Sequence, residues 1–248
     1  MAKNLKMGDT VYVPWSRLGL ADGGDGKPYA ISTATVAKVE NRTVHLNIPG
    51  EGERSVASSA DEAGIAIIRI GDYQTETTLL DPLAKSVLQY CRLLVADDTV
   101  RLWELRTETE LQQFWSINHS AYRHVILIAH GGPDGLMFGD QPLPADQLGQ
   151  VFAVEGQSPK IFLSLSCQTG QAAFSRQFSK SPGCETLIAP FGSIHGAVAS
   201  QFCQTFMGFH LIEGRTKVAF NRTRESVPSG ARFRLWQKGK MQTPGAES

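Results

Sequence analysis

Apolar and polar positions alternate in the first part of the chain in a way that is typical of short β-strands. Thr10 to Pro14 and Thr43 to Ile48 place an apolar side chain at every second position, and Ala34 to Glu40 leads into the second of these through Asn41-Arg42. A period of two predicts strands with one buried face, and the tight connection predicts a hairpin. We therefore expect a small β domain over residues 1–62.

The remainder of the chain alternates between apolar runs and amphipathic segments. The apolar runs predict buried strands at 64–70, 100–105, 124–129, 161–165 and 186–189. Helical spacing predicts helices after Asp81, after Thr107, and over 144–152, 171–178 and 197–212. Asp81-Pro82 is typical of a helix start with aspartate as N-cap, and Thr107 with Glu110 predicts a capping box. This alternation predicts a second domain over 63–248, an α/β fold with helices on both faces of a parallel sheet.

Composition narrows the class of protein. The chain has 248 residues, of which 42% are hydrophobic, as in globular proteins, and no apolar run approaches a membrane span. The first residues lack the apolar core of a secretion signal, and the four cysteines lack the spacing of a zinc site. We therefore expect a cytoplasmic protein with reduced thiols and no membrane segment.

The balanced net charge conceals an uneven distribution. The whole chain holds 24 basic and 24 acidic residues, which gives no overall attraction to nucleic acid or membrane. Between Arg215 and Lys240, however, there are 8 basic residues and a single acid, Glu225. This basic stretch could bind an anionic partner or could be a solvated strand edge, and both interpretations stay open.

Two chemically active side chains fall at predicted strand ends. His130, followed by Gly131-Gly132, ends one buried strand, and Cys167 ends the next. Sites of parallel sheets form at the carboxyl ends of strands, so the imidazole and the thiol are expected to face each other. Histidine can activate a thiol, and the N–H groups of Gly131 and Cys167 are candidate oxyanion donors. The alternative is that both residues merely fill the core.

The other cysteines fit a packing role. Cys91 and Cys203 lie on apolar faces of predicted helices, and Cys184 lies in what we predict to be a Ser-Pro-Gly loop. Position therefore singles out Cys167 as the candidate nucleophile.

The sequences around the two candidates resemble a known family. HVILIAHGG, which ends in His130-Gly131-Gly132, and IFLSLSCQTG, which contains Cys167, are similar to the signatures of caspase-like (clan CD) cysteine peptidases, and of bacterial CHAT proteins in particular. The GLMFGDQPL hairpin after the histidine fits the same pattern. The resemblance implies a caspase-like α/β/α sandwich with a mostly parallel sheet. Separately, the first 62 residues resemble a small SH3-like barrel.

The resemblance also implies a function. It suggests a cysteine endopeptidase that cleaves protein substrates through a His130–Cys167 dyad, with Gly131 and Cys167 as oxyanion donors and with no metal or organic cofactor. Members of this clan are often held dormant until an activating protein partner binds, and several bacterial ones act in antiviral defence or programmed death. We expect the same regulation here.

Specificity is where the sequence departs from its family. The resemblance places these residues around the substrate: Asp134, Asp140, Leu165, Ser166, Phe191 and His195. Leu165 stands two residues before the cysteine, where relatives that cut after basic residues often carry an acid. Asp134 or Asp140 could accept a basic residue before the scissile bond, whereas His195 could favour an acidic or neutral one. Both interpretations stay open.

An alternative function is retained. The protein could be a catalytically inactive caspase-like adaptor whose β-barrel and basic C-terminal stretch bind a protein or nucleic-acid partner. Nucleic-acid binding predicts an affinity that falls steeply with salt.

Overall fold

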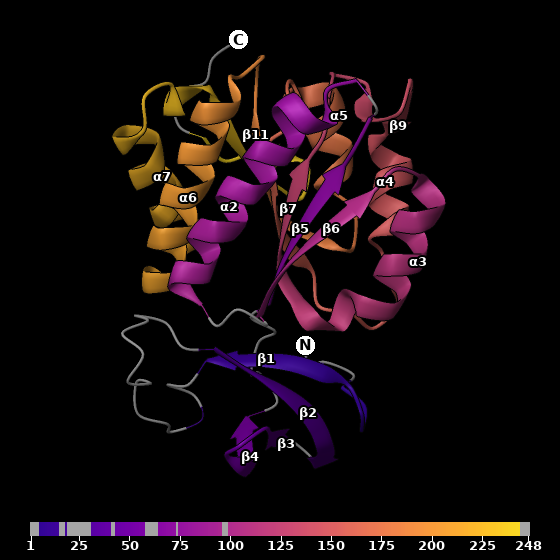
Figure 1. Cartoon of the computed structure of the whole chain (residues 1–248), viewed down its shortest axis with the longest axis vertical. Coiled ribbons are helices and arrows are strands. Elements are labelled where there is room, and N and C mark those ends of the chain that lie inside the picture. Colours follow the sequence, from indigo (N-terminus) through magenta and orange to yellow (C-terminus); the bar gives the residue numbers. More distant parts are fainter. Residues whose placement is uncertain are drawn as a thin grey trace.

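The computed structural model describes residues 5–14, 18, 31–40, 43–57, 64–72, 74–95 and 99–243. Within these residues the chain forms a four-stranded antiparallel sheet near its N-terminus and a seven-stranded, mostly parallel sheet covered by helices (Figure 1). A separate two-stranded hairpin lies beside the larger sheet.

The N-terminal sheet is an antiparallel meander. Its strands are β1 (Thr10–Pro14), β2 (Ile31–Glu40), β3 (Thr43–Ile48) and β4 (Gly52–Ala57), paired in that order. Val44, Leu46 and Ile48 of β3 point inward at every second position, as the sequence predicts, and pack with Val11 and Val36 in a hydrophobic cluster of their own.

The described strands form an open meander with an irregularity in β2 at Val36 and Lys38. The resemblance to an SH3-like barrel stays a prediction. The predicted domain boundary between residues 62 and 63 and the predicted turn at Asn41-Arg42 lie outside the described residues.

The larger sheet confirms the predicted α/β class. Its order is β13-β12-β11-β10-β7-β5-β6, and the five strands from β11 to β6 run parallel. Their bounds are β5 (Gly64–Ile70), β6 (Val100–Leu105), β7 (Tyr122–Ile128), β10 (Lys160–Ser164) and β11 (Cys184–Pro190). β12 (Phe233–Gln237) and β13 (Lys240–Met241) add antiparallel to one edge. The hairpin consists of β8 (Gly135–Phe138) and β9 (Gln141–Pro144).

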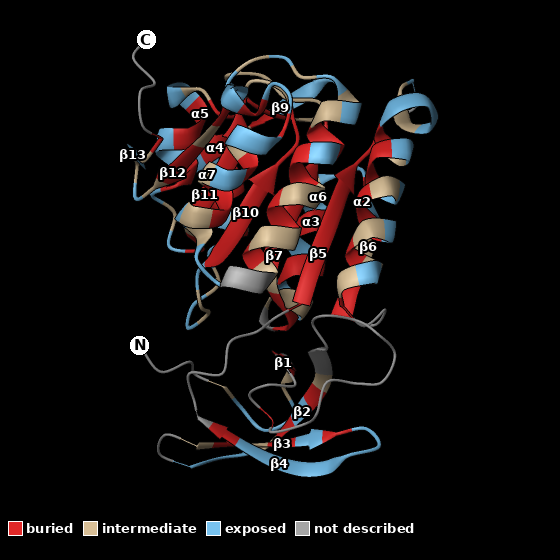
Figure 2. Cartoon of the chain, turned by 90° about the vertical axis from the view of Figure 1, so that its left-hand side faces the viewer, coloured by how far each residue is buried: buried red, intermediate tan, exposed pale blue. Residues whose placement is uncertain are grey.

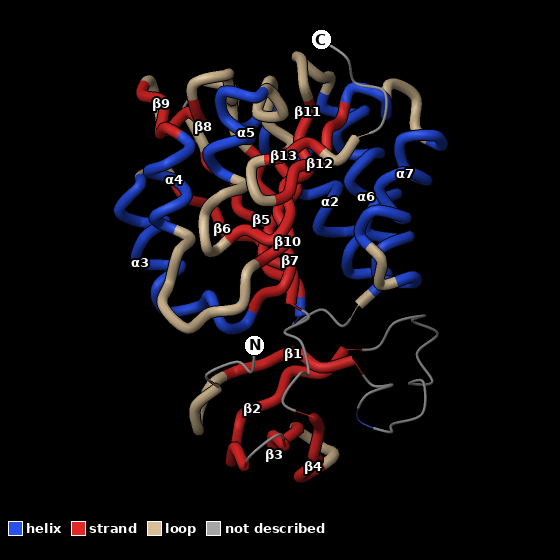
Figure 3. Tube along the Cα trace, turned by 180° about the vertical axis from the view of Figure 1, so that it is seen from behind, coloured by secondary structure: helices blue, strands red, loops and turns tan. Residues whose placement is uncertain are grey.

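Helices cover both faces of this sheet, so the fold has three layers (Figures 1 and 3). α2 (Asp81–Leu94), α6 (Gly196–Glu213) and α7 (Thr216–Ser226) lie on one face; α3 (Glu108–Asn118), α4 (Ala145–Val151) and α5 (Ala172–Phe178) lie on the other. Short turns complete the chain: η1 (Glu76–Leu80), η3 (His119–Ala121) and η4 (Gly230–Arg232). The predicted capping box of Thr107 and Glu110 is present at the start of α3.

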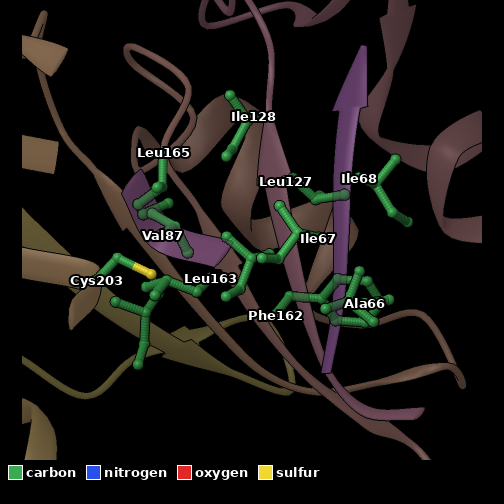
Figure 4. Close-up of a cluster of buried hydrophobic side chains, with 14 of the residues drawn as sticks. Ala66, Ile67, Ile68, Val87, Leu127, Ile128, Phe162, Leu163, Leu165 and Cys203 are labelled. Atoms are coloured by element: carbon green, nitrogen blue, oxygen red, sulfur yellow. The ribbon is translucent and has the colours of Figure 1, made fainter. Parts of the chain in front are cut away.

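The core lies between these layers (Figure 2). Every residue of β5 and β10 is buried, which is what parallel strands covered on both faces require. Figure 4 shows one side of this core, where Val87 of α2 and Cys203 of α6 meet Leu163 and Leu165.

Two local predictions are corrected by the structure. Asp81 is not an N-cap, because the π-helical turn η1 runs directly into α2 and the capping position is Leu80. Cys184 is not in a loop but is the first residue of β11. The basic stretch from residue 215 onward also contains a helix that the sequence analysis did not predict, α7, before its strand.

The N-terminal sheet lies near the starts of the parallel strands, at the end of the larger sheet opposite to their carboxyl ends (Figure 1). β1 contacts the turn η3. Among the described residues, no helix is long and apolar enough to cross a membrane.

Candidate active site

His130 lies just beyond the carboxyl end of β7, where the β8–β9 hairpin fixes the backbone. The N–H of Met137 donates to the carbonyl of His130 at 3.0 Å, and the N–H of Gly132 donates to that of Gly135 at 3.0 Å. The side chain of His130 is 42% exposed. The imidazole is therefore held on a rigid base and remains accessible from solvent.

The ring of His130 is oriented by two residues that follow β5. Thr75 Oγ1 lies 2.6 Å from His130 Nε2, and Asp72 Oδ2 lies 3.3 Å from the same nitrogen. The Thr75 hydroxyl donates to Asp72 Oδ2 at 2.6 Å. β5 and β7 are adjacent parallel strands, so their carboxyl ends bring these groups together.

This chain of contacts assigns the protons. The Thr75 hydroxyl donates its only hydrogen to Asp72, so its oxygen can only accept a hydrogen bond from His130. Nε2 of His130 therefore carries a hydrogen and donates it. In the neutral ring Nδ1 is then the basic nitrogen. Among the described residues, Nδ1 has no protein hydrogen-bond partner.

Asp72 is kept ionised by its surroundings. Its carboxylate accepts hydrogen bonds from the Thr75 side chain and from the backbone N–H groups of Thr75 and Gln74. The two hydrogen bonds from Thr75 contribute most to lowering the pKa of Asp72, burial opposes them, and the Gln74 hydrogen bond and the charge of His130 add smaller decreases. A fixed negative charge therefore lies beside the imidazole.

The loop carrying Cys167 packs directly against the residue after the histidine. A Cβ placed on Gly131 would lie 2.7 Å from the carbonyl oxygen of Cys167 and 2.9 Å from Cβ of Ser166, so only glycine fits here without a shift. Ser166 Oγ also accepts from the N–H of Ala129 at 3.1 Å. The structure thus brings the loops that carry His130 and Cys167 together, and the facing of the imidazole and the thiol stays a prediction.

The loop turns tightly at Gln168, the residue after Cys167. Gln168 has φ 63°, the left-handed region that non-glycine residues rarely adopt. Its N–H donates to the carbonyl of Gly192 at 3.2 Å, and the N–H of Gly170 donates to that of Pro190 at 2.8 Å. The loop is therefore attached to the end of β11 as well as to β7.

The sulfur of Cys167 contacts the loop between β11 and α6 (residues 191–195). The N–H of Ile194 donates to Sγ at 3.4 Å, and the thiol lies 3.9 Å from the carbonyl oxygen of Ile194. Cys167 is half-buried, whereas the other three cysteines are buried. The backbone of Ile194 therefore fixes the position of the sulfur from the 191–195 loop.

Gly131 offers its N–H to the site. Gly131 and Leu136 form an antiparallel bridge whose hydrogen bonds are made by the flanking residues, His130 with Met137 and Gly132 with Gly135. In such a pair the N–H of Gly131 points away from the hairpin. Among the described residues it has no acceptor, and neither does the N–H of Cys167.

A buried arginine holds the loop that carries Asp72 and Thr75. Arg69 is 3% exposed and lies 3.2 Å from Glu76, 3.0 Å from Asp81 and 3.0 Å from Glu104. Glu76 follows Thr75 immediately and begins the π-helical turn η1. Arg69 thereby anchors the end of the loop whose other residues contact His130.

The remaining predicted site residues fall into three groups. Leu165 and Ser166 are buried beneath the Cys167 loop, at 4% and 0% exposure. Phe191 is 49% exposed beside that loop, and Nδ1 of His195 accepts from the N–H of Ala197 as the N-cap of α6. Asp134 and Asp140 are exposed in the turns before and within the β8–β9 hairpin. A role for any of these six in substrate binding stays a prediction.

The other thiols are chemically inert by position. Burial raises the pKa of Cys91 to about 12, and it also raises the pKa values of Cys184 and Cys203. No group of three or more metal-binding side chains occurs among the residues described.

Sequence reasoning did not find Asp72, Thr75 or Arg69. A signal for the first two was available, because both follow the carboxyl end of a buried strand, the rule that selected His130 and Cys167. The Sγ contact of Ile194 had no sequence signal, since it depends on how the β11–α6 loop folds back.

Comparison with known proteins identifies the fold. No family model matches the chain, and no curated protein matches it. Among solved structures, it is similar to a secreted C11 cysteine protease from Bacteroides thetaiotaomicron in complex with an irreversible peptide inhibitor, with a TM-score of 0.50 and 9% identity over 71% of this chain and 66% of that one.

Two further structures are more distant. An inactive zymogen C11 protease from Parabacteroides distasonis has a TM-score of 0.47 and 9% identity over 70% of this chain and 61% of that one. The Saccharomyces cerevisiae separase–securin complex has a TM-score of 0.44 and 14% identity over 71% of this chain and 12% of that one. The chain thus spans just under two thirds of the C11 protease lengths. At 9% identity, the first likeness establishes a shared fold alone.

Proposed function

We propose that this chain is a cysteine endopeptidase in which Cys167 is the nucleophile and His130 the general base. The observation that carries the proposal is the Asp72–Thr75–His130 chain of hydrogen bonds, which leaves Nδ1 of the imidazole as the basic nitrogen, next to Gly131, which packs on the Cys167 loop. The likeness of the fold to a cysteine protease supports it.

The reaction follows from these positions. Nδ1 of His130 takes the thiol proton, and Sγ of Cys167 attacks a peptide carbonyl carbon. The resulting imidazolium gives this proton to the leaving amine as the carbon–nitrogen bond breaks, which leaves a thioester. His130 then takes a proton from water, whose oxygen attacks the thioester and releases the acid and the thiol.

Each transient charge has a partner in the site. The negative oxygen of the tetrahedral intermediate would receive hydrogen bonds from the N–H groups of Gly131 and Cys167. The positive charge on the imidazolium is compensated by Asp72, through Thr75. The residues described supply every group that this reaction needs, so the proposal includes no metal or organic cofactor.

The finer assignments are part of the same proposal. We place the chain with the caspase-like clan and with bacterial CHAT proteins, on the HVILIAHGG and IFLSLSCQTG segments and the β8–β9 hairpin. The N-terminal meander is proposed to be an SH3-like appendage, on its strand pattern. A cytoplasmic location, a protein substrate, an activating protein partner and a defence role complete the proposal.

A peptide library tests the activity. Purified protein is incubated with a diverse peptide mixture, with and without lysate of the native host, and new termini are identified by mass spectrometry. Cleavage that is absent from Cys167→Ala supports the proposal, and a requirement for lysate supports an activating partner. A folded wild-type protein that cleaves nothing in either condition contradicts it and favours the inactive adaptor.

Thiol labelling gives an independent readout. A small electrophile should modify Cys167 alone in the native protein, because burial protects the three other cysteines. Labelling of Cys91 or Cys203 in preference to Cys167 would contradict the assignment of the nucleophile.

A further inference from the structure

The fold places part of the basic stretch beside the Cys167 loop. β12 pairs antiparallel with β11, so the start of β12 lies next to the end of β11, where the 191–195 loop begins. The N–H of Phe191 donates to the carbonyl of Arg232 at 2.8 Å. The first residues of β12 therefore lie beside the loop that contacts the sulfur.

Arg232 reaches further toward the sulfur. Its Nη1 donates to the carbonyl oxygen of Ser193 at 3.0 Å, and the next residue, Ile194, donates its N–H to Sγ of Cys167 at 3.4 Å. This path places Nη1 within roughly 9 Å of the sulfur. Arg232 is exposed, and a guanidinium has five N–H groups, so most of its donors remain free for a ligand.

Arg234 lies at the same place, and Arg224, whose guanidinium lies over the ring of Phe220 on α7, acts on it through its charge. Arg234 lies over the ring of Phe191, 5.3 Å from its centroid. Burial and the nearby charge of Arg224 lower the pKa of Arg234, so the two guanidinium groups are close enough to repel. The Nε of Arg224 is buried and has no hydrogen-bond partner in the described part of the chain.

We call Arg224, Arg232 and Arg234 the arginine cluster. Within the described part of the chain, no carboxylate forms an ion pair with any of the three. A bound anion would relieve the repulsion and use the free donors. The arginine cluster can therefore bind a negatively charged ligand next to the candidate nucleophile.

We propose that the arginine cluster binds the carboxylate of an acidic substrate residue, the one whose carbonyl carbon Cys167 attacks, with Arg232 as the main contact. This specificity rests on the proposed peptidase function. The carboxylate of Asp or Glu at that position reaches about 7 Å from the sulfur, within hydrogen-bond distance of a guanidinium placed as Arg232 is. The exposed ring of Phe191 offers an apolar surface beside it.

The geometry favours an acidic residue over a basic one. The 191–195 loop contains no acid, and Leu165 and Ser166, which precede the cysteine, are buried. Asp134 and Asp140 are associated with the hairpin rather than with the Cys167 loop. The charged side chain that hydrogen-bonds to the 191–195 loop, beside the sulfur, is Arg232, and it is positive.

Cleavage kinetics test the proposal. A peptide from the library is made with Asp, Asn, Glu, Gln, Lys or Arg before the scissile bond. We expect the Asp and Glu peptides to have the highest kcat/KM, and Arg232→Gln to lower the Asp-to-Asn ratio at least tenfold. Lys217→Gln removes the same charge from an exposed position of α7 and should not change the ratio. A preference for Lys or Arg, or a ratio insensitive to Arg232→Gln, overturns the proposal.

Binding to the Cys167→Ala protein separates this inference from the proposed function. Fluorescence polarisation compares labelled peptides that differ only in Asp or Asn. Preferential binding of the Asp peptide that is lost in Arg232→Gln supports the arginine cluster as a carboxylate site. This holds even if the wild-type protein cleaves nothing, because that result contradicts only the proposed peptidase activity. Equal binding of both peptides overturns the cluster as a carboxylate site, as does an oligonucleotide that binds through Arg232 where the Asp peptide does not.

Discussion

Thr75 Oγ1 lies 2.6 Å from Nε2 of His130, although 55 residues separate them in the chain. The threonine hydroxyl is the bridge between the imidazole and the carboxylate of Asp72. It fixes the tautomer in which Nδ1 is basic, and it transmits the negative charge toward the ring. A dyad of His130 and Cys167 alone would not fix the tautomer of the imidazole.

Replacing the bridge should impair catalysis without unfolding the protein. Thr75→Val keeps the shape of the side chain but removes the hydroxyl, so His130 can adopt the wrong tautomer or turn away. We expect kcat to fall about a hundredfold, the usual scale of general-base catalysis. The measurement is steady-state cleavage of a library-derived peptide.

Thr75→Ser is the matched control, because it retains the hydroxyl and should keep most of the activity. Asp72→Asn should resemble Thr75→Val, since it removes the charge behind the same hydroxyl. Equal activity of Thr75→Val and Thr75→Ser would mean that the contact has no catalytic role.

Two neighbouring glycines offer a second test. In Gly131→Ala the new Cβ would meet the Cys167 carbonyl at 2.7 Å and Thr169 Cγ2 at 3.1 Å, so the Cys167 loop must move. A displacement of about 1 Å at the nucleophile can lower activity about a hundredfold. In Gly132→Ala the Cβ meets nothing within 4 Å.

Peptide cleavage and electrophile labelling of Cys167 should both fall in Gly131→Ala and persist in Gly132→Ala. If the two variants retain equal activity, the close packing of Gly131 on the Cys167 loop is not required for function.

The sequence predicts the large sheet well because its signals are local and redundant. The apolar runs at β5, β7 and β10 can only be satisfied by burial on both faces, and the helix spacing between them leaves parallel pairing as the outcome. His130 and Cys167 follow from the same topology, since each stands just past such a strand.

The parts that sequence reasoning missed depend on long-range contacts. Asp81 has the local signature of an N-cap, but it lies 3.0 Å from Arg69, and η1 continues the helix backward past it. The position of Arg232 beside the Cys167 loop follows from the pairing of β12 with β11, which joins residues far apart in the chain, such as Pro190 and Phe233. Composition alone shows only a basic stretch.

Arg69 should contribute strongly to stability. Arg69→Met removes the buried cation of Glu76 and Asp81, which keep only the exposed side chains of Arg106 and Lys85, and breaking a buried ion pair costs about 3 kcal/mol. Arg106 also pairs with Glu76 but is 49% exposed, so Arg106→Gln should cost less than about 1 kcal/mol. Urea unfolding of both variants measures the difference, and similar midpoints would contradict the anchoring role of Arg69.

A buried pair of histidines should make the protein sensitive to mild acid. The rings of His124 on β7 and His210 on α6 lie 5.1 Å apart, and neither nitrogen of His124 has a hydrogen-bond partner among the residues that the structure describes. Burial, with the charge of Arg123, lowers the pKa of His210 to about 4, and burial with His210 and Arg123 lowers that of His124 well below its usual value.

Both rings are therefore neutral when folded but take up protons near pH 6.5 when unfolded, so stability is full above that pH and falls as the pH drops toward 4. Each histidine contributes a slope of about 1.4 kcal/mol per pH unit. His210→Phe, which keeps an aromatic ring stacked near Phe206, should reduce this slope between pH 5 and 7 in urea unfolding. An unchanged slope would show that His210 is already protonated in the folded protein, or that other groups dominate its acid response.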